Sequence, residues 1–245
     1  MVNGLYTSAV SMMHLQKKQD VISNNLANAN TTGFKKSMLL TNAKVDIKRN
    51  DEQKLHQDED QNLDEVYTDF SQGPLVQTDN GLDIAISGDA LFSVETEDGT
   101  RYTRNGSFSL NAMGELVTLS GDPVLNTNGG RILLNGQDFS VLGDGGLFVK
   151  GTKIGQLGMF EFENKNMLLA RGKGYFENLD EENNSAESSK NSTLKQGFLE
   201  TSNVNTVESM VQMIIAHRNY EASQKALMSS DDTLKKAVNE VGRVG

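Results

Sequence analysis

The chain has 245 residues, which is enough for one large domain or two modest domains with a buried core. It contains no cysteine, so disulfides, thiol catalysis and thiolate metal sites are excluded. Its formal net charge of −10 argues against a nucleic-acid partner, because contact with phosphates calls for a basic face.

The sequence gives no sign of a membrane span or a cleavable leader. The longest apolar run, Met213–Ala216, has only four residues, far fewer than a bilayer requires. The first twenty residues lack both a basic start and an apolar block, so no cleavable secretory signal is expected. If the protein leaves the cytoplasm, we expect it to use another route.

The first predicted element is a long amphipathic helix over residues 4–28. Gly33 follows it as a natural stop, because glycine readily takes a positive φ at a helix end. The apolar residues of this segment recur at spacings of three, four and seven, as one helix face requires. They are Leu5, Ala9, Met12, Leu15, Ile22 and Leu26.

Residues 35–66 are acidic and polar, and they predict a linker or an extended segment. Part of this stretch mimics the odd positions of a calcium loop, at Asp58, Asp60, Asn62 and Asp64. The glycine of the sharp turn is missing, since Leu63 stands in its place. A solvated acidic loop is therefore favoured over a calcium site.

From Tyr67 onward the pattern is that of short β-strands. Leu82, Ile84 and Ile86 alternate after the turn dipeptide Asn80-Gly81, and residues 91–104 indicate a hairpin. Glycines punctuate further short strands through about Phe162, and residues 178–193 form a second polar loop. We predict a meandering, mostly antiparallel β-rich domain over residues 67–198.

The last stretch, residues 199–245, predicts a second long helix with Asn205 as its N-cap. At ~1.5 Å per residue it would be roughly 55 Å long. Its apolar residues form two sets on nearly opposite sides, which indicates two sets of partners and hence assembly. The sets are Val204, Val207, Val211 and Ile214, then Leu227, Leu234, Val238 and Val241. An alternative is a bent helix, or two helices broken near residues 229–231.

Both ends of the chain are therefore helical, whereas the middle is not. We predict an α+β fold in which the N- and C-terminal helices pair as a coiled coil, with the β-domain inserted between them. The predicted boundaries are residues 1–34 for the first helix, 35–66 for the linker, 67–198 for the β-domain and 199–245 for the second helix.

No catalytic constellation stands out. The three histidines His14, His56 and His217 are far apart, and none has a partner at ligand spacing. Ser192 and Lys195 match the serine–lysine spacing of penicillin-interactive enzymes, but the companion motifs are missing. We predict no catalytic, metal or cofactor site and no small-molecule substrate, so a structural role is favoured over an enzymatic one.

Several stretches together resemble the bacterial flagellar rod and hook proteins, in the same order along the chain. They are residues 24–35 (NNLANANTTGFK), 72–75 (QGPL), 78–88 (TDNGLDIAISG), 102–108 (YTRNGSF) and 196–205 (QGFLETSNVN). Length and motif style are similar to the basal-body rod proteins of the distal-rod type. The chain departs from the family pattern at residues 89–92, where DALF replaces the usual Gly-Phe-Phe.

The resemblance implies a non-catalytic subunit of the basal-body rod, the hollow drive shaft that transmits torque to the hook. It implies contact with other copies of the chain, with neighbouring rod, hook and ring proteins, and with the flagellar type III export apparatus. It also implies a location in the flagellar basal body outside the cytoplasmic membrane.

Ten positions form the predicted assembly interface. They are Leu5, Met12, Ile22, Leu26, Val207, Val211, Ile214, Leu227, Leu234 and Val238. Two other classes of function stay open at this point: a secreted binding or adhesion module that displays the β-domain, and an exported peptidoglycan hydrolase. The second is disfavoured because no acid or serine constellation is found.

Overall fold

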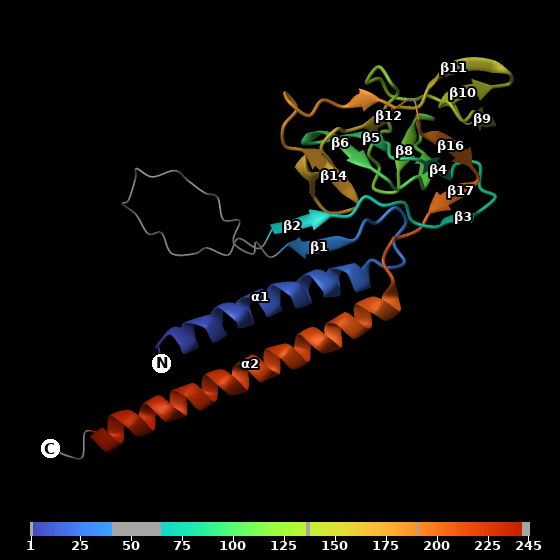
Figure 1. The fold of residues 1–245 in the computed structure, drawn as a ribbon. Coiled ribbons are helices and arrows are strands. Elements are labelled where there is room, and N and C mark those ends of the chain that lie inside the picture. Colours follow the sequence, from blue (N-terminus) through green and yellow to red (C-terminus); the bar gives the residue numbers. More distant parts are fainter. Residues whose placement is uncertain (1, 41–64, 136–137, 190, 242–245) are drawn as a thin grey trace. The chain divides into compact units, whose positions relative to one another are not determined.

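The computed structural model describes residues 2–40, 65–135, 138–189 and 191–241 of the chain (Figure 1). The chain divides into two compact units. The helical unit comprises Met1–Leu26, Ser37–Tyr67 and Thr206–Gly245, and the β unit comprises Ala27–Lys36 and Thr68–Asn205. The acidic stretch predicted to be a loop, with the calcium-like pattern and His56, lies outside the described residues.

The helical unit contains one long helix near each end of the chain, α1 (Val2–Ala27) and α2 (Thr206–Val241). The strands β1 (Ser37–Leu40) and β2 (Glu65–Thr68) form a two-stranded sheet. The side chain of Asn25, near the end of α1, forms two hydrogen bonds with the first residue of β1. Its Nδ2 donates to the carbonyl of Ser37 at 2.7 Å, and its Oδ1 accepts from the Ser37 N–H at 2.8 Å.

Helix α2 is continuous, so the alternative of a break near residues 229–231 is wrong. It begins at Thr206, directly after Asn205, as an N-cap at that position predicts. The hydroxyl of Ser230 donates to the Ala226 carbonyl at 2.9 Å, and that of Thr233 donates to the Ser229 carbonyl at 2.8 Å. Because these hydroxyls bond back to the helix itself, they do not interrupt it.

The predicted coiled coil between the two terminal helices is wrong. Over the residues that the structure describes, α1 and α2 share no extended packed interface. A coiled coil needs an apolar seam that both helices bury. Val207, Val211 and Ile214, large apolar residues of α2, are each more than half exposed.

The β unit is built from short antiparallel strands. In chain order they are β3 (Leu75–Gln77), β4 (Ile84–Ser87), β5 (Leu91–Thr96), β6 (Gly99–Thr103), β7 (Phe108–Leu110), β8 (Leu116–Thr118), β9 (Phe139–Val141), β10 (Gly146–Val149), β11 (Thr152–Gln156), β12 (Met159–Glu161), β13 (Leu168–Ala170), β14 (Tyr175–Asn178), β15 (Glu187–Ser188), β16 (Thr193–Gln196) and β17 (Phe198–Glu200). A single 3-10 turn, Lys165–Met167, precedes β13.

Six of these strands form the largest sheet, in the order β13-β14-β6-β5-β12-β15. Strands β9, β10 and β11 form a three-stranded sheet, and β7 pairs with β8. The predicted hairpin over residues 91–104 is confirmed, since β5 pairs antiparallel with β6. Its register places Phe92 opposite Thr103 and Thr96 opposite Gly99.

The core of the β unit lies around β4 and β5. Ile84 and Ile86 are fully buried, and the ring of Phe92 meets that of Phe108 edge to face at 5.2 Å between centroids. Ala85, between the two isoleucines, is also buried, so β4 is covered on both faces. Apolar burial on this scale is the main stabilising contribution to such a unit.

The last two strands return from the end of the chain to complete this unit (Figure 1). β16 pairs with β4, and β17 pairs with β3, both antiparallel. Leu194 in β16 enters the core cluster. The predicted β-rich domain, residues 67–198, contains β16, but no strand was predicted there. The end of β17 falls in residues 199–245, which were predicted as the last helix, so both strands were missed.

Candidate functional site: a buried clasp and an exposed helix face

Three segments that are far apart in the sequence are bound together within the β unit. We call them the clasp: residues 33–36, 69–74 and 200–203. Backbone hydrogen bonds join all three. The N–H of Gly33 donates to the Glu200 carbonyl at 2.8 Å, and Asp69 N–H donates to the Lys36 carbonyl at 2.8 Å. Thr201 N–H donates to the carbonyl of Pro74 at 2.9 Å.

The side-chain amide of Asn203 connects the other two segments of the clasp. Its Oδ1 accepts from the backbone N–H of Lys36 at 2.7 Å. Its Nδ2 donates to the Asp69 carbonyl at 2.9 Å and lies 3.0 Å from the Ser71 hydroxyl and 3.2 Å from the Ser71 carbonyl. An amide carries a donor and an acceptor side by side on one short planar group, which suits this position.

Glu200 is the centre of a buried ionic cluster. Its Oε1 lies 2.6 Å from the Lys35 ammonium and also accepts from the Gly73 N–H at 2.8 Å. Its Oε2 accepts from Arg104 Nε at 2.7 Å. The side chains of all three ionic residues are at most 2% exposed. Lys35 donates a further bond to the Ser71 carbonyl at 2.7 Å.

The cluster holds two cations and one carboxylate, so backbone carbonyls supply the remaining acceptors. The terminal nitrogens of Arg104 donate to the carbonyls of Ala90 and Gly88. Burial lowers the pKa of the Lys35 ammonium below its ordinary value, and the Glu200 carboxylate opposes that shift. Removing one partner of such a pair leaves an uncompensated buried charge, which costs ~3–5 kcal/mol.

Two glycines of the clasp lie where another backbone segment comes very close. Gly33 has φ +68°, and a Cβ there would lie 2.4 Å from the backbone nitrogen of Asn105. A Cβ on Gly73 would lie 2.1 Å from the carbonyl oxygen of Thr201. Any larger residue at either position would force the backbone apart.

The helical unit offers a different feature, an apolar face of α2 that is open to solvent. We call it the α2 apolar face. Its five residues are spaced by one, three and four positions, so at ~100° per residue they share one side of the helix. They are Val207 (69% exposed), Met210 (52%), Val211 (51%), Ile214 (54%) and Ile215 (52%). A contiguous apolar surface of this kind marks an interaction site.

The opposite side of α2 is the covered one. Ser209 and Ala216 are buried, and Leu227 and Leu234 are half-buried. The two apolar sets predicted on α2 therefore differ in environment: the first set is largely exposed, apart from the buried Val204, and the described members of the second are partly covered.

The remaining predicted interface residues lie mainly in α1. Ile22 is buried, whereas Met12 and Leu26 are half-buried. The side chains of Leu5 and Val238 lie outside the described part of the structure. Within the β unit, the residues of the clasp were not predicted as site residues from the sequence.

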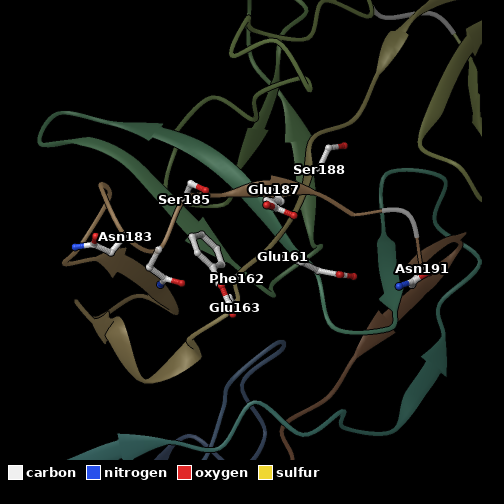
Figure 2. A pocket seen from close by; sticks show the side chains of 9 residues that line it. Glu161, Phe162, Glu163, Asn183, Ser185, Glu187, Ser188 and Asn191 are labelled. Carbon is white, nitrogen blue, oxygen red and sulfur yellow. The ribbon is translucent and has the colours of Figure 1, made fainter.

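A polar pocket with a volume of about 390 Å³ lies beside β12 and β15. Figure 2 shows its lining, which includes Glu161, Glu163, Glu187 and Asn183. Across the described residues, no group of three or more metal-ligating side chains is found. The same part of the chain contains no helix long and apolar enough to cross a membrane.

The serine–lysine pair singled out from sequence is structural in its contacts. Ser192 is buried, accepts from the N–H groups of Asp89 and Ala90 at 3.0 and 3.1 Å, and donates to Glu161 at 2.7 Å. Lys195 is an exposed residue of β16, and its Nζ lies 5.9 Å from the ring centroid of Phe198. His217 Nε2 lies 3.3 Å from a carboxylate oxygen of Glu221, one turn along α2, at an exposed site. None of these contacts makes a nucleophile–base pair.

Three family models match different parts of the chain. "Flagella basal body rod protein" matches residues 5–35, "Flagellar hook protein FlgE/F/G D1 domain" matches 85–149, and "Flagellar basal body rod FlgEFG protein C-terminal" matches 195–240. The three residues of the buried ionic cluster fall one in each match: Lys35, Arg104 and Glu200. The cluster thus joins the three parts of the chain that the family models match.

Curated proteins of similar length align with almost the whole chain. The flagellar basal-body rod protein FlgG of Bacillus subtilis (strain 168) is 35% identical, over 98% of this chain and 99% of its own length. FlgF of Rhizobium meliloti (strain 1021) is 32% identical, over 99% of each chain. The hook-basal body complex protein FlhO of Bacillus subtilis is 31% identical over the full length of both. Nothing in these comparisons supports an adhesion module, and the matched families are structural rather than enzymatic.

Proposed function

Because the chain belongs to the family of flagellar basal-body rod proteins and is a structural subunit of that rod, we propose that the α2 apolar face joins it to neighbouring subunits. As a component of the flagellar basal body, it associates with other flagellar structural proteins. We propose below which surface of the chain makes this association and which proteins that surface contacts.

The observation that carries the proposal is the exposure of Val207, Val211 and Ile214 on one side of α2. Exposed large apolar side chains gain roughly 25 cal/mol for each Å² that association removes from water. Scattered apolar residues on a surface need no explanation, but five on one helix face do. A subunit that is packed between neighbours in a shaft supplies that explanation.

The closest partners that we propose are other copies of the same chain. A contact between two different surfaces of identical subunits continues from one copy to the next and builds an open helical assembly, as a shaft requires. Rod, hook and ring proteins would then meet the ends and the outside of the assembly. The full proposed interface keeps the ten positions predicted from sequence. Those ten are Leu5, Met12, Ile22, Leu26, Val207, Val211, Ile214, Leu227, Leu234 and Val238.

We also propose that the chain reaches the basal body through the flagellar type III export apparatus and lies outside the cytoplasmic membrane. Once assembled, the shaft transmits torque to the hook. In this role the subunit performs no chemistry, and its work is to keep its shape under load.

The test replaces Ile214 with aspartate, which places a charge in the centre of the α2 apolar face. Asn219→Asp is the matched control, since it adds the same charge at an exposed polar position of the same helix. We expect Ile214→Asp to abolish swimming and to leave basal bodies that end short of the hook in electron micrographs. The control should swim normally.

The purified variants should have equal melting temperatures, because Ile214 is exposed in the single chain. Normal swimming by Ile214→Asp would contradict the proposed interface. Complete basal bodies in cells that lack the gene altogether would contradict the role in the rod itself.

A further inference from the structure

The chain passes between its two units at four places. These crossings are residues 26/27, 36/37, 67/68 and 205/206. Any force carried along the covalent chain from one unit to the other must therefore pass through one of them. The clasp lies just inside these points, because residues 33–36, 69–74 and 200–203 are the parts of the β unit next to three of the crossings.

Within the clasp, the side chains of Lys35, Glu200 and Asn203 each bond to both other segments. Of these three residues, Asn203 is the nearest along the chain to the crossing into α2. Its Oδ1 holds the N–H of Lys36, which is the last residue before one crossing. Its Nδ2 holds the carbonyl of Asp69, which is the second residue after another. Asn203 itself stands two residues before the crossing into α2. The Asn203 side chain thus links the residues of the β unit that lie next to three of the crossings.

Glu200 anchors the same strand three residues earlier. Its carboxylate is buried and bonded to Lys35 and Arg104, so the strand cannot slide along its neighbours without breaking both ion pairs. Because these groups are buried, salt in the solvent screens the pairs far less than it screens surface pairs. The anchor therefore holds at the ionic strength of the cell exterior as well as in dilute buffer.

We propose that Asn203 is a positioning residue through which force passes between the helical unit and the β unit. This inference rests on the proposed torque-transmitting role. Force that arrives along α2 passes Asn203 before it reaches the β17–β3 pairing, and Asn203 shares it with residues 33–36 and 69–74. The clasp thereby protects the short β-strands from being separated one after another by the pulling force.

The experiment stretches the full-length chain by its two ends with an optical trap. Pulling on both ends loads residues 27–36 and 200–205 directly. Asn203→Ala is compared with Asn178→Ala, the matched control. Asn178 is a buried asparagine of the same unit, whose Nδ2 donates to the Asn184 carbonyl at 2.6 Å, and it lies far along the chain from every crossing.

We expect Asn203→Ala to lower the first unfolding force, whereas Asn178→Ala leaves it at the wild-type value. Hydrogen exchange supplies the second measurement. The amides of Lys36 and Asp69 should exchange at least about tenfold faster in Asn203→Ala, because the bonds that hold their segments are lost. Equal unfolding forces for the two alanine variants would overturn the inference.

Ser71→Ala keeps the inference testable if Asn203→Ala fails to fold. It removes only the Ser71 hydroxyl, 3.0 Å from Asn203 Nδ2, at an exposed position. We expect a smaller fall in the unfolding force in the same direction, and an unchanged force would count against the inference.

In cells, Asn203→Ala should build complete basal bodies but lose swimming speed more steeply than Asn178→Ala as the viscosity of the medium rises. Parallel loss of speed in the two variants would contradict the inference while leaving the rod role intact. Truncated basal bodies in Asn203→Ala would show that the residue acts in assembly, which would also contradict it.

Discussion

The single carboxylate of Glu200 compensates two buried cations. The stability of the β unit is therefore especially sensitive to the loss of this residue. Lys35 and Arg104 lie 165 and 96 positions before Glu200 in the sequence. Neither cation has a second carboxylate within ion-pair distance among the described residues. The loss of Glu200 therefore leaves two buried positive charges without a carboxylate partner. Neither side chain can reach solvent unless the unit unfolds.

We expect Glu200→Gln to lower the free energy of unfolding by about 3–5 kcal/mol, because it removes the charge and retains the shape. Glu95→Gln is the control. Glu95 pairs with Arg131 at 2.7 Å on the exposed surface, where solvent screens the pair, so its loss should have a much smaller effect. Urea denaturation of the purified chains, followed by circular dichroism, measures both. Equal effects of the two changes would show that the buried cluster has no special role.

Gly106, which lies between β6 and β7, allows this segment to come very close to the backbone of β4. A Cβ built at this position would lie 1.7 Å from the carbonyl oxygen of Ile84, whose N–H in turn bonds to the Gly106 carbonyl at 3.0 Å. The motif that contains Gly106 is part of the family resemblance, and the structure supplies the steric reason for a glycine there.

Which charged residues would pair could not be predicted from the sequence. The chain has 33 acidic and 23 basic residues, so the number of conceivable pairs is very large. Lys35, Arg104 and Glu200 all stand in stretches that resemble the family, but nothing in their spacing indicates that they meet. Their contact is a product of the tertiary fold, which brings together residues that are 96 and 165 positions apart.

At the scale of elements, local patterns were the reliable part of the prediction. The two terminal helices and the hairpin over residues 91–104 arise from periodicity and turn residues that lie close together in the sequence. The coiled coil failed because pairing is not local. The covered side of α2 contains Ser209 and Ala216, small residues that an apolar pattern does not identify, while the large apolar residues remain exposed.

β16 and β17 were missed for a related reason. Each has only three or four residues, too few for alternation to stand out, and each pairs with a strand more than 100 positions earlier in the chain. Leu194 nevertheless belongs to the main core, and Lys195 beside it is exposed. The β unit thus depends on residues near the end of the chain to cover β4.

We expect Leu194→Ala to lower the free energy of unfolding by about 2–5 kcal/mol, because it leaves a cavity beside β4. Leu169→Ala is the matched control: it is the same substitution on β13, at a side chain that is 39% exposed. The control should lose less than half as much stability. Thermal melts of the two purified variants test this difference, and equal losses would mean that β16 does not complete the core.

At the scale of the whole molecule, two properties oppose each other. The formal net charge of −10 makes copies of the chain repel one another, whereas the α2 apolar face favours their association. Repulsion between surface charges is screened over about 10 Å at 0.1 M salt and about 3 Å at 1 M, but apolar attraction is not weakened by salt in this way. Ionic strength should therefore shift the balance toward assembly.

We expect the purified chain to sediment mainly as a monomer at low salt and to form larger species as sodium chloride is raised toward 1 M. Ile214→Asp should remain monomeric across that range, because the change adds a charge to the α2 apolar face and removes apolar area from it. Asn219→Asp should behave as the unaltered chain does. Analytical ultracentrifugation at a fixed protein concentration measures all three. Association of Ile214→Asp at the same salt concentration as wild type would mean that another surface of the molecule joins the copies.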